Sequence, residues 1–439
     1  MFRSARLRAQ RGISLIETLV VVVVVVIAML ALYGLVDASN KITKQETEVA
    51  DVQQSARIGV SQLSRIIRQS GVGSLYYANA VLPVTNNSAG GTSLTDISGA
   101  SHFIRKGTDV IAVRGVLSAD RYALSPSDVT CTGGCDTTTT MTITIRSTTI
   151  RGFVNFAASA TPLLAGKTRP FYFAVVDETN QNVTVGGSTY VVPYYTVGLV
   201  TANTSGTWYT LDTTTTPANP TFTFTMNPAD TGARKFNATT SLSAGLTLPV
   251  RCGAVDEVRF FVDEGAVDAS ALTVDTHPSL AQATLDPSTG NYDVQTLIED
   301  VEDFQIAYGV DGADATTPDG GVSPRAVDTS GENKDEWVGN SAGEVTDTLP
   351  ISTANASHSG VDKFINTSAA AGVFAVPALH SVWISLVVKS TDPDLVFNGP
   401  GARGIKILDS TAVSFSATTG RPYRRRPVSL AVSLRNYNS

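Results

Sequence analysis

The sequence is poor in the residue types that build most catalytic and metal sites. Its 439 residues include only three cysteines and four histidines, and charged residues make up 16% of the chain. The histidines, His102, His277, His358 and His380, are scattered and show none of the spacings that metal sites need. No phosphate-binding or dinucleotide-binding glycine motif is present, and residues 339–343 spell G-x-S-x-G without the strand and helix signals that a nucleophile elbow requires. The sequence therefore predicts no enzymatic activity and no cofactor.

The three cysteines are too few and too far apart for a cysteine-based zinc site, which needs four ligands at recognisable spacing. Cys131 and Cys135 flank Thr-Gly-Gly, a segment short enough to fold into a tight loop. One hypothesis is a local Cys131–Cys135 disulfide, as an oxidising compartment would allow, and the other is a pair of free thiols. In either case Cys252 is left over, and we expect it to be a buried free thiol.

The net charge makes nucleic acid an unsuitable partner. The formal net charge is −7, whereas nucleic-acid-binding domains concentrate positive charge on one face. Two local groups of charge have simple interpretations. The adjacent acids Glu302 and Asp303 are interpreted as solvated charges beside a strand. The arginines near the C-terminus are interpreted as an exposed loop that leads into the last strand: Arg421, Arg424, Arg425 and Arg426.

One acidic turn offers oxygen ligands to a metal ion. Asp311 and Asp314 stand close together after an apolar segment, which makes them a calcium candidate. The segment lacks the alternating ligands and the terminal glutamate of an EF-hand loop. An acidic turn after a strand explains these residues more simply, so no metal is predicted.

The sequence does contain one long apolar run near its start. Residues 1–12 hold four arginines and no acid, and the apolar stretch 13–36 contains one charged residue, Glu17. As a helix rising about 1.5 Å per residue, this stretch is long enough to cross a hydrocarbon core of about 30 Å. The arginines before the span predict a cytoplasmic leader and an exported C-terminal bulk. A secretory signal or a plain single-span anchor would share these features, but neither explains a carboxylate at membrane depth.

A second helical segment is predicted directly after the membrane span. Apolar residues recur there at intervals of three or four, as on one face of an amphipathic helix. These residues are Val49, Val52, Ala56, Val60, Leu63 and Ile67. No proline interrupts residues 13–70, and the glycines of Gly71-Val72-Gly73 are a typical helix end. The sequence therefore predicts one long helix with a transmembrane half, 13–36, and an amphipathic stalk half, 37–71.

Residues 72–439 predict an antiparallel β-rich head, so the fold class is α+β. The predicted strands are Asp109–Arg114, Met141–Ile150, Phe171–Val176, Thr189–Val200, Thr221–Met226, Glu257–Val262, Phe304–Tyr308, Val382–Val388 and Val428–Arg435. In the last of these, the large apolar residues Val428, Leu430, Val432 and Leu434 occupy every second position, which indicates one buried face. The Thr-rich region at about 118–250 is interpreted as an insertion that enlarges a smaller head.

The segment Gly12-Ile13-Ser14-Leu15-Ile16-Glu17 closely resembles the processing signal of type IV pilins and type II secretion pseudopilins. The resemblance implies that a prepilin peptidase cuts between Gly12 and Ile13 and that Ile13 is N-methylated. The first mature residue in this family is usually Phe, and here it is Ile. Glu17 is then the fifth mature residue, where the family keeps a glutamate that takes part in filament assembly. There it neutralises the new α-amine of a neighbouring subunit in an apolar core.

Several further segments are similar to PilW-type minor pilins. They are the helix end at 56–71, and residues 107–114, 297–311, 383–388 and 424–436. The resemblance implies a minor pilin that acts in pilus assembly and priming, near the tip because its head is large. It implies a single-pass inner-membrane protein with a periplasmic head, which moves to the pilus and cell surface on assembly. The implied partners are prepilin peptidase, other minor pilins, the major pilin, the inner-membrane assembly platform and a tip adhesin.

Two alternatives to a minor pilin remain open from the sequence. The J-class pseudopilin of type II secretion shares the helix end and would use the same anchoring physics in a secretion machine. A membrane-anchored periplasmic binding protein, in which Glu17 has no special role, belongs to a different functional class.

Overall fold

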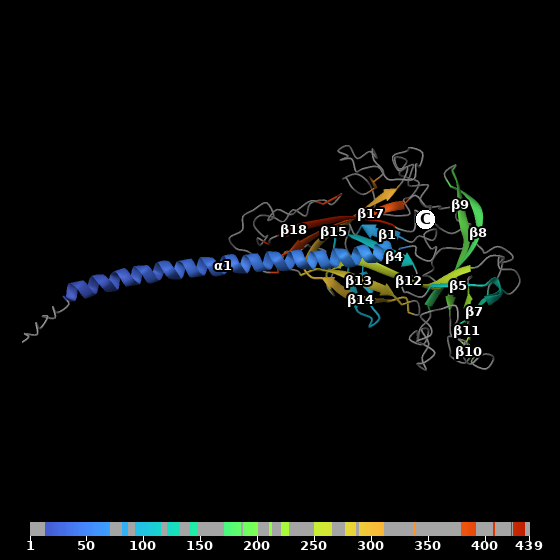
Figure 1. Ribbon diagram of the computed structural model, residues 1–439, viewed down its shortest axis with the longest axis horizontal. Coiled ribbons are helices and arrows are strands. Elements are labelled where there is room, and N and C mark those ends of the chain that lie inside the picture. The colour runs from blue at the N-terminus through green and yellow to red at the C-terminus, as the bar shows by residue number, and fades with distance from the viewer. Residues whose placement is uncertain are drawn as a thin grey trace, which may run out of the picture. The chain divides into compact units, whose positions relative to one another are not determined.

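The computed structural model describes the chain in segments. These are residues 14–70, 81–86, 93–115, 121–131, 140–146, 171–185, 188–200, 210–212, 221–227, 250–265, 277–286, 289–310, 337–338, 379–391, 407–408, 423 and 425–434. The chain divides into two compact units, Met1–Gln53 and Gln54–Ser439, and the boundary falls inside the N-terminal helix. One long apolar helix is thus followed by a β-rich region of antiparallel sheets, as the sequence predicted (Figure 1).

The helix α1 runs from Leu15 to Arg68 and includes both halves that the sequence predicted. Its valine-rich part is helical although β-branched residues disfavour helices in water. In lipid only internal hydrogen bonding satisfies the backbone, so a helix is the stable form there. Large apolar side chains from Leu15 to Val36 are exposed. Within the described residues, α1 is the one helix that is long and apolar enough to cross a membrane.

The strands, in chain order, are β1 (Val81–Asn86), β2 (Ser93–Thr95), β3 (Ser101–Phe103), β4 (Asp109–Gly115), β5 (Arg121–Leu124), β6 (Val129–Cys131), β7 (Met141–Arg146), β8 (Phe171–Val185), β9 (Ser188–Val200), β10 (Thr210–Asp212), β11 (Thr221–Asn227), β12 (Val250–Asp263), β13 (Ser279–Leu285), β14 (Tyr292–Ile298), β15 (Val301–Val310), β16 (Trp337–Val338), β17 (Leu379–Lys389) and β18 (Arg425–Ser433). A short 3₁₀ helix, η2, spans Pro126–Asp128. Each of the predicted strands overlaps one of these, and residues 147–150 and 435 of the predicted strands lie outside the described residues.

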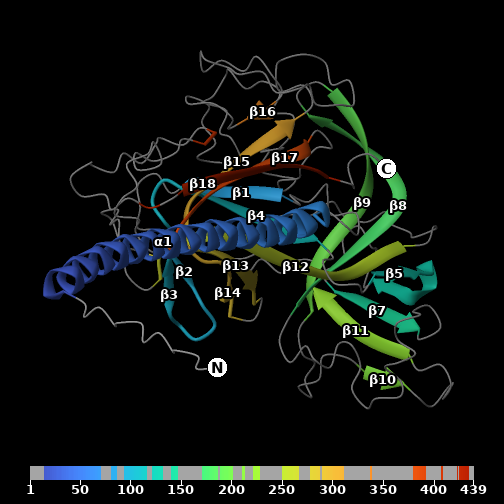
Figure 2. The ribbon, with the colours of Figure 1, turned by 60° about the vertical axis from the view of Figure 1, so that its left-hand side comes forward.

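The strand β12 is shared between two groups of strands in the largest sheet. Its first half, residues 250–255, pairs with β8 and β5, and its second half, residues 256–263, pairs with β4 and β13. The strands β5 to β11 pair only with one another and with the first half of β12 among the described strands. Figures 1 and 2 show β12 running from this group toward β4 and β13. The predicted insertion at 118–250 coincides with this group and stays a prediction.

A separate four-stranded antiparallel sheet has the order β16-β15-β17-β18. Its inner face is apolar, since Phe304, Ile306 and Leu386 are fully buried. The alternation predicted for the last strand is confirmed, because Val432 is buried while its neighbours Ala431 and Ser433 are exposed. The strand β15 contacts β4, β12 and β13 of the large sheet, so the two sheets pack around a common core.

The last turns of α1, which belong to the second unit, pack on this core. Six residues of this part of the helix are buried, and four of them belong to the predicted stripe: Ala56, Gly59, Val60, Leu63, Ser64 and Ile67. The first two residues of the stripe, Val49 and Val52, are only half-buried. Gly59 faces Ile298 at the end of β14. A Cβ atom added to Gly59 would lie 1.9 Å from Cδ1 and 2.2 Å from Cγ1 of Ile298. Any larger residue at position 59 would therefore force the side chain of Ile298 to move.

We predict that Gly59→Ala destabilises the head by about 1–3 kcal/mol, because the new methyl group has no space beside Ile298. The measurement is urea unfolding of the full-length protein in detergent, followed by near-ultraviolet circular dichroism. Ser61→Ala changes an exposed residue of the same helix and is expected to shift stability by less than about 0.5 kcal/mol.

The mechanism is tested by a double-mutant cycle. Ile298→Ala removes both atoms that the new methyl group would meet, at a cost of about 2–5 kcal/mol by itself. The double variant Gly59→Ala/Ile298→Ala is expected to be more stable than the sum of the two effects by at least about 0.5 kcal/mol. Simple additivity would contradict the proposed contact.

Candidate assembly site

The N-terminal signal lies at the start of α1. Gly12 and Ile13 fall just outside the described residues, so their processing stays a prediction. Glu17 lies in the first turn of α1 with its side chain exposed, and no described residue bonds to it. A carboxylate in the first turn complements the partial positive charge of the helix N-terminus. In an apolar membrane or filament interior, this carboxylate would still need a cation from another chain.

The segment that follows β14 carries the chain from the large sheet to the four-stranded sheet. β14 ends at Ile298 and β15 begins at Val301, so the two strands are separated by Glu299 and Asp300 alone. Asp300 has a φ of 59°, in the left-handed region that non-glycine residues rarely enter and that Asp tolerates better than most. We call residues 298–303 the corner.

The side chain of Asp300 fixes the corner to two other segments. Its Oδ1 atom lies 2.6 Å from Nδ1 of His277, which precedes β13. Its Oδ2 atom accepts a hydrogen bond of 2.8 Å from Oγ1 of Thr391, which follows β17. The backbone carbonyl of Asp300 accepts a further bond of 2.9 Å from the N–H of Lys389. These bonds compensate the unusual backbone conformation and hold both sheets at the same point.

Glu302 occupies a β-bulge in β15. Val301 pairs with Val388 and Asp303 pairs with Val387, so Glu302 is an extra residue in the ladder. Its carboxylate accepts hydrogen bonds from Nε and, at 3.0 Å, from Nη2 of Arg425 at the start of β18. This bidentate geometry is the strongest form of an Arg–carboxylate pair. The pair is buried, so loss of one partner leaves the other charged and unsolvated.

A third charge, Lys389, lies in the same cluster. Lys389 pairs directly with Arg425 across β17 and β18, and both are buried. Burial lowers the pKa of Lys389, while the carboxylates of Glu302 and Asp300 act in the opposite direction. The ammonium Nζ lies 4.6 Å from the ring centroid of Tyr423, a cation–π contact that replaces part of the lost hydration.

The loop before β4 joins the cluster from the large sheet. Nη1 of Arg105 donates a hydrogen bond of 2.7 Å to Glu264 in a buried ion pair. Four residues further on, Oδ2 of Asp109 accepts a bond of 2.8 Å from the N–H of Ile306. Nε2 of Gln305 donates to the carbonyl of Gly107 at 2.7 Å. The carboxylate of Asp109 thus satisfies a backbone N–H of β15 from outside the four-stranded sheet.

Two interpretations from the sequence are wrong here. Glu302 and Asp303 are buried, at 6% exposure each, and are not solvated charges. Arg425 is not part of an exposed loop, because it is the first residue of β18 and pairs with Glu302. Arg426 is exposed, as that interpretation expects, but it too lies in β18 and not in a loop. Arg421 and Arg424 lie outside the described residues. Local sequence shows an acidic pair and a basic run, but not the bulge that turns one acid toward one arginine.

The other candidate ligands do not gather into a site. Among the described residues no group of three or more His, Cys, Asp or Glu side chains is arranged to hold a metal ion. His102 lies 2.7 Å from Asp263 by its Nδ1 atom, and His277 binds Asp300 instead. The calcium candidates Asp311 and Asp314, and residues 339–343, lie outside the described part of the chain.

The two cysteines that the structure describes, Cys131 and Cys252, differ in oxidation state. Cys252 is a buried free thiol, as predicted, and burial raises its pKa well above the usual range. Cys131 is disulfide-bonded. Cys135 lies outside the described residues, so its pairing with Cys131 stays a prediction.

Two protein-family models match the chain, one at its N-terminus and one over its C-terminal part. Residues 7–33 match the prokaryotic N-terminal methylation motif, and residues 259–436 match the type IV pilus-assembly protein W family, PilW. Together the two matches support a type IV minor pilin-like prepilin. The PilW match contains the corner, Lys389 and Arg425, so the buried charge cluster lies almost wholly inside the family region. No curated protein and no solved structure matched the chain.

We predict that Arg425→Gln destabilises this prepilin by about 3 kcal/mol, since it leaves the buried carboxylate of Glu302 with only Lys389 nearby. Arg426→Gln is the matched control, because it makes the same change at the next residue, which is exposed. Its effect should stay within about 0.5 kcal/mol. Urea unfolding of the full-length protein, followed by tryptophan fluorescence, measures both. An equal loss of stability in the two variants would contradict the buried pairing of Arg425 with Glu302.

Proposed function

We propose that this prepilin is a minor pilin that primes assembly of a type IV pilus and stays near its tip. The type IV pilin role and inner-membrane anchoring rest on the methylation motif and the PilW match. The match to a pilus-assembly family favours a pilus over the secretion pseudopilus as the structure that this chain builds. If the chain were a membrane-anchored binding protein, neither the methylation motif nor the PilW match would be explained.

The N-terminal chemistry supports assembly through α1. Cleavage between Gly12 and Ile13 would expose an α-amine, which is then methylated, at the head of an apolar helix. Glu17, exposed in the first turn of that helix, is placed to neutralise the amine of a neighbouring subunit. An ion pair in an apolar interior depends strongly on both partners, because a single buried charge is costly. Misplaced subunits would therefore be rejected.

The size of the β region supports a position near the tip. The large sheet and the four-stranded sheet both follow α1, and the strands β5 to β11 add further bulk. A bulky head would crowd a tightly wound shaft, whereas a tip or an initiating complex leaves room beside it. The partners we propose are prepilin peptidase, other minor pilins, the major pilin and the inner-membrane platform. The head is periplasmic before assembly and exposed at the cell surface afterwards, where a tip adhesin could join it.

The first test is the mass of the intact protein from membranes and from sheared filaments. We expect a mature form that begins at Ile13 and carries one methyl group, present in both fractions. Glu17→Gln is expected to leave cleavage intact but to remove the protein from the sheared fraction, because the neutral amide cannot balance the amine. Asp37→Asn, the matched neutralisation of an exposed acid that pairs with Lys41, should behave as the wild type.

A mass that retains residues 1–12 in cells with active prepilin peptidase would overturn the processing. Filament incorporation of Glu17→Gln at the wild-type level would overturn the role of the carboxylate.

The second test addresses priming. Deletion of the gene should reduce the number of surface pili and abolish twitching motility, because initiation would fail while the major pilin is still made. Complementation with the wild-type chain should restore both. Normal piliation together with a defect in protein secretion would instead support the pseudopilin alternative.

A further inference from the structure

The strands β8 and β9 extend beyond the sheet to which they belong. β12 pairs with β8 only as far as Asp177, and β11 pairs with β9 only at the last two residues of β9. Past a bulge after Asp177, the segment Asn180–Val185 of β8 pairs with Ser188–Pro193 of β9. No other described strand pairs with either segment. We call these two paired segments the arm.

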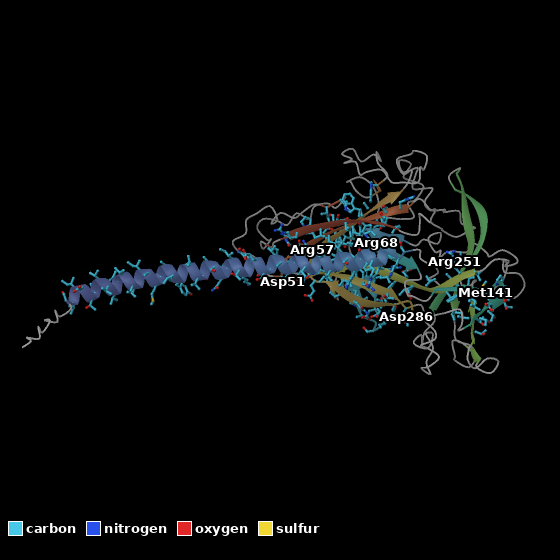
Figure 3. The ribbon with its side chains drawn as sticks, viewed as in Figure 1. Asp51, Arg57, Arg68, Met141, Arg251 and Asp286 are labelled. Carbon is cyan, nitrogen blue, oxygen red and sulfur yellow. The ribbon has the colours of Figure 1, made fainter. Side chains whose placement is uncertain are left out.

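The base of the arm lies beside β12. Figure 3 labels Arg251 of β12, which pairs with Val176 of β8 just before the bulge. In Figures 1 and 2 the strands β8 and β9 continue past β12 from this point. Within the described part of the chain, the arm therefore has an open edge on each of its two strands.

The arm is an unusual structure to leave alone in water. A hairpin of two strands without a third is marginally stable at best. Open edges of natural sheets usually carry a charge, Lys above all, or a proline, because either one blocks pairing with another chain. Residues 179–211 contain no Asp, Glu, Lys or Arg. The arm therefore lacks the charges that would keep its edges unpaired.

Edge strands of more than four residues elsewhere in the described sheets are protected in these ways. β1 contains Pro83 and a register shift, β18 contains Pro427, and β14 carries the exposed Asp293. Within the arm, β9 carries Pro193, which has no backbone N–H to donate. The segment Asn180–Val185 of β8 has neither a proline nor a charge. Of the two edges of the arm, that of β8 is thus the one suited to pairing.

A second copy of this chain fits the β8 edge best. Identical chains with the same anchor hold their arms at the same height above the bilayer, so two such edges meet without a shift. A strand of another protein would have to lie at that height by coincidence. Two identical edges without charge do not repel each other. An isologous contact about a two-fold axis also uses the same edge twice and leaves no β8 edge open.

The direction of the arm allows such an axis. The arm and the last turns of α1 belong to the same compact unit. Figures 1 and 2 both show the arm running across the direction of those turns. A two-fold axis along the turns reverses the arm but leaves both helices pointing the same way, as anchoring in one membrane requires. It therefore places the two β8 edges antiparallel to each other.

We propose that two copies of this chain pair through the β8 edges of their arms. The result is an antiparallel four-stranded sheet, β9-β8-β8-β9, across a two-fold axis. Main-chain hydrogen bonds supply the contact, as in other cases of strand addition, and they cover an edge that is otherwise prone to aggregation. The dimer goes beyond the proposed function, because it requires two copies anchored in one membrane but neither cleavage nor filament assembly.

The first test is a cysteine scan of β8 in the full-length protein. Each residue from Asn180 to Val185 is replaced by Cys in turn, and disulfide-linked dimer in membranes is measured on non-reducing gels. In an isologous antiparallel pair, each step away from the axis moves the two copies of a residue about 7 Å further apart. A disulfide spans a Cβ separation of only about 3.5–4.5 Å. The yield should therefore show one maximum, near Asn182, and fall about tenfold within two residues of it.

The control for the scan lies on the other strand of the arm. Val191 pairs with Asn182 across the hairpin, so Val191→Cys places the thiol on β9. It should give no more dimer than the wild-type chain, in which Cys252 is buried. The scan is repeated in cells without prepilin peptidase, where the same maximum is expected. A failure of processing is thus separated from a failure of pairing.

The second test changes the charge of the β8 edge, with Asn182→Cys as the reporter. When the axis passes at Asn182, Asn180 of one copy lies opposite Thr184 of the other. Asn180→Lys/Thr184→Lys should lower the yield of dimer about tenfold, and Asn180→Glu/Thr184→Glu should do the same, because like charges then face each other. Thr189→Lys/Val191→Lys, which adds the same charge to β9, is the control and should keep the yield.

The decisive sample contains the lysine and glutamate variants in the same cells, each with its own tag. Opposite charges then face each other, so mixed dimers should return to near the wild-type yield. This recovery also shows that both variants fold.

Three outcomes would overturn the proposal. Equal yields at every position of the scan would indicate a parallel or non-specific association. The absence of any maximum, in a protein that reaches the membrane in the normal amount, would show that the edge does not meet its copy. Failure of the mixed variants to recover the yield would assign the β8 edge to a strand of another protein.

Discussion

The carboxylate of Glu302 lies near two buried cations, Arg425 and Lys389. Its ion pair with Arg425 fixes the register of β18 relative to β17 and β15. Phe304 faces the apolar core, and a residue two positions away in a regular strand would face the core as well. The bulge at Glu302 turns its side chain to the opposite face, where Arg425 lies. A slip of one residue in β18 would carry Arg425 to the other face and leave Glu302 unpaired. A buried ion pair is weak evidence for stability but here excludes wrong registers.

The same corner receives the N-terminal helix. Ile298 touches the backbone of α1 at Gly59, and two residues later Asp300 binds segments next to β13 and β17. The last turns of the helix and both sheets therefore meet within a few residues of chain. The contact between the helix and β14 leaves no space for an added methyl group at Gly59 unless Ile298 moves.

Much of this architecture could be predicted from the sequence. The apolar run, the stripe from Ala56 to Ile67 and the alternation in β18 follow from periodicity, because burial there repeats with the secondary structure. β13 and β14 were missed, since residues such as Ala283 and Gln295 have little preference for strands and pair only because β12 offers an edge. The charge cluster was missed for a related reason. Glu302 and Arg425 are far apart in sequence, and a bulge leaves no pattern in the residues around it.

The continuity of β12 has a mechanical consequence. Its first half pairs with β8 and its second half with β13, yet a single backbone runs through both. A force on the strands β5 to β11 therefore reaches the second half of β12 through covalent bonds. That half is held on both sides by its ladders with β4 and β13. The group β5 to β11 is therefore joined to the strands β4 and β13 by one continuous strand.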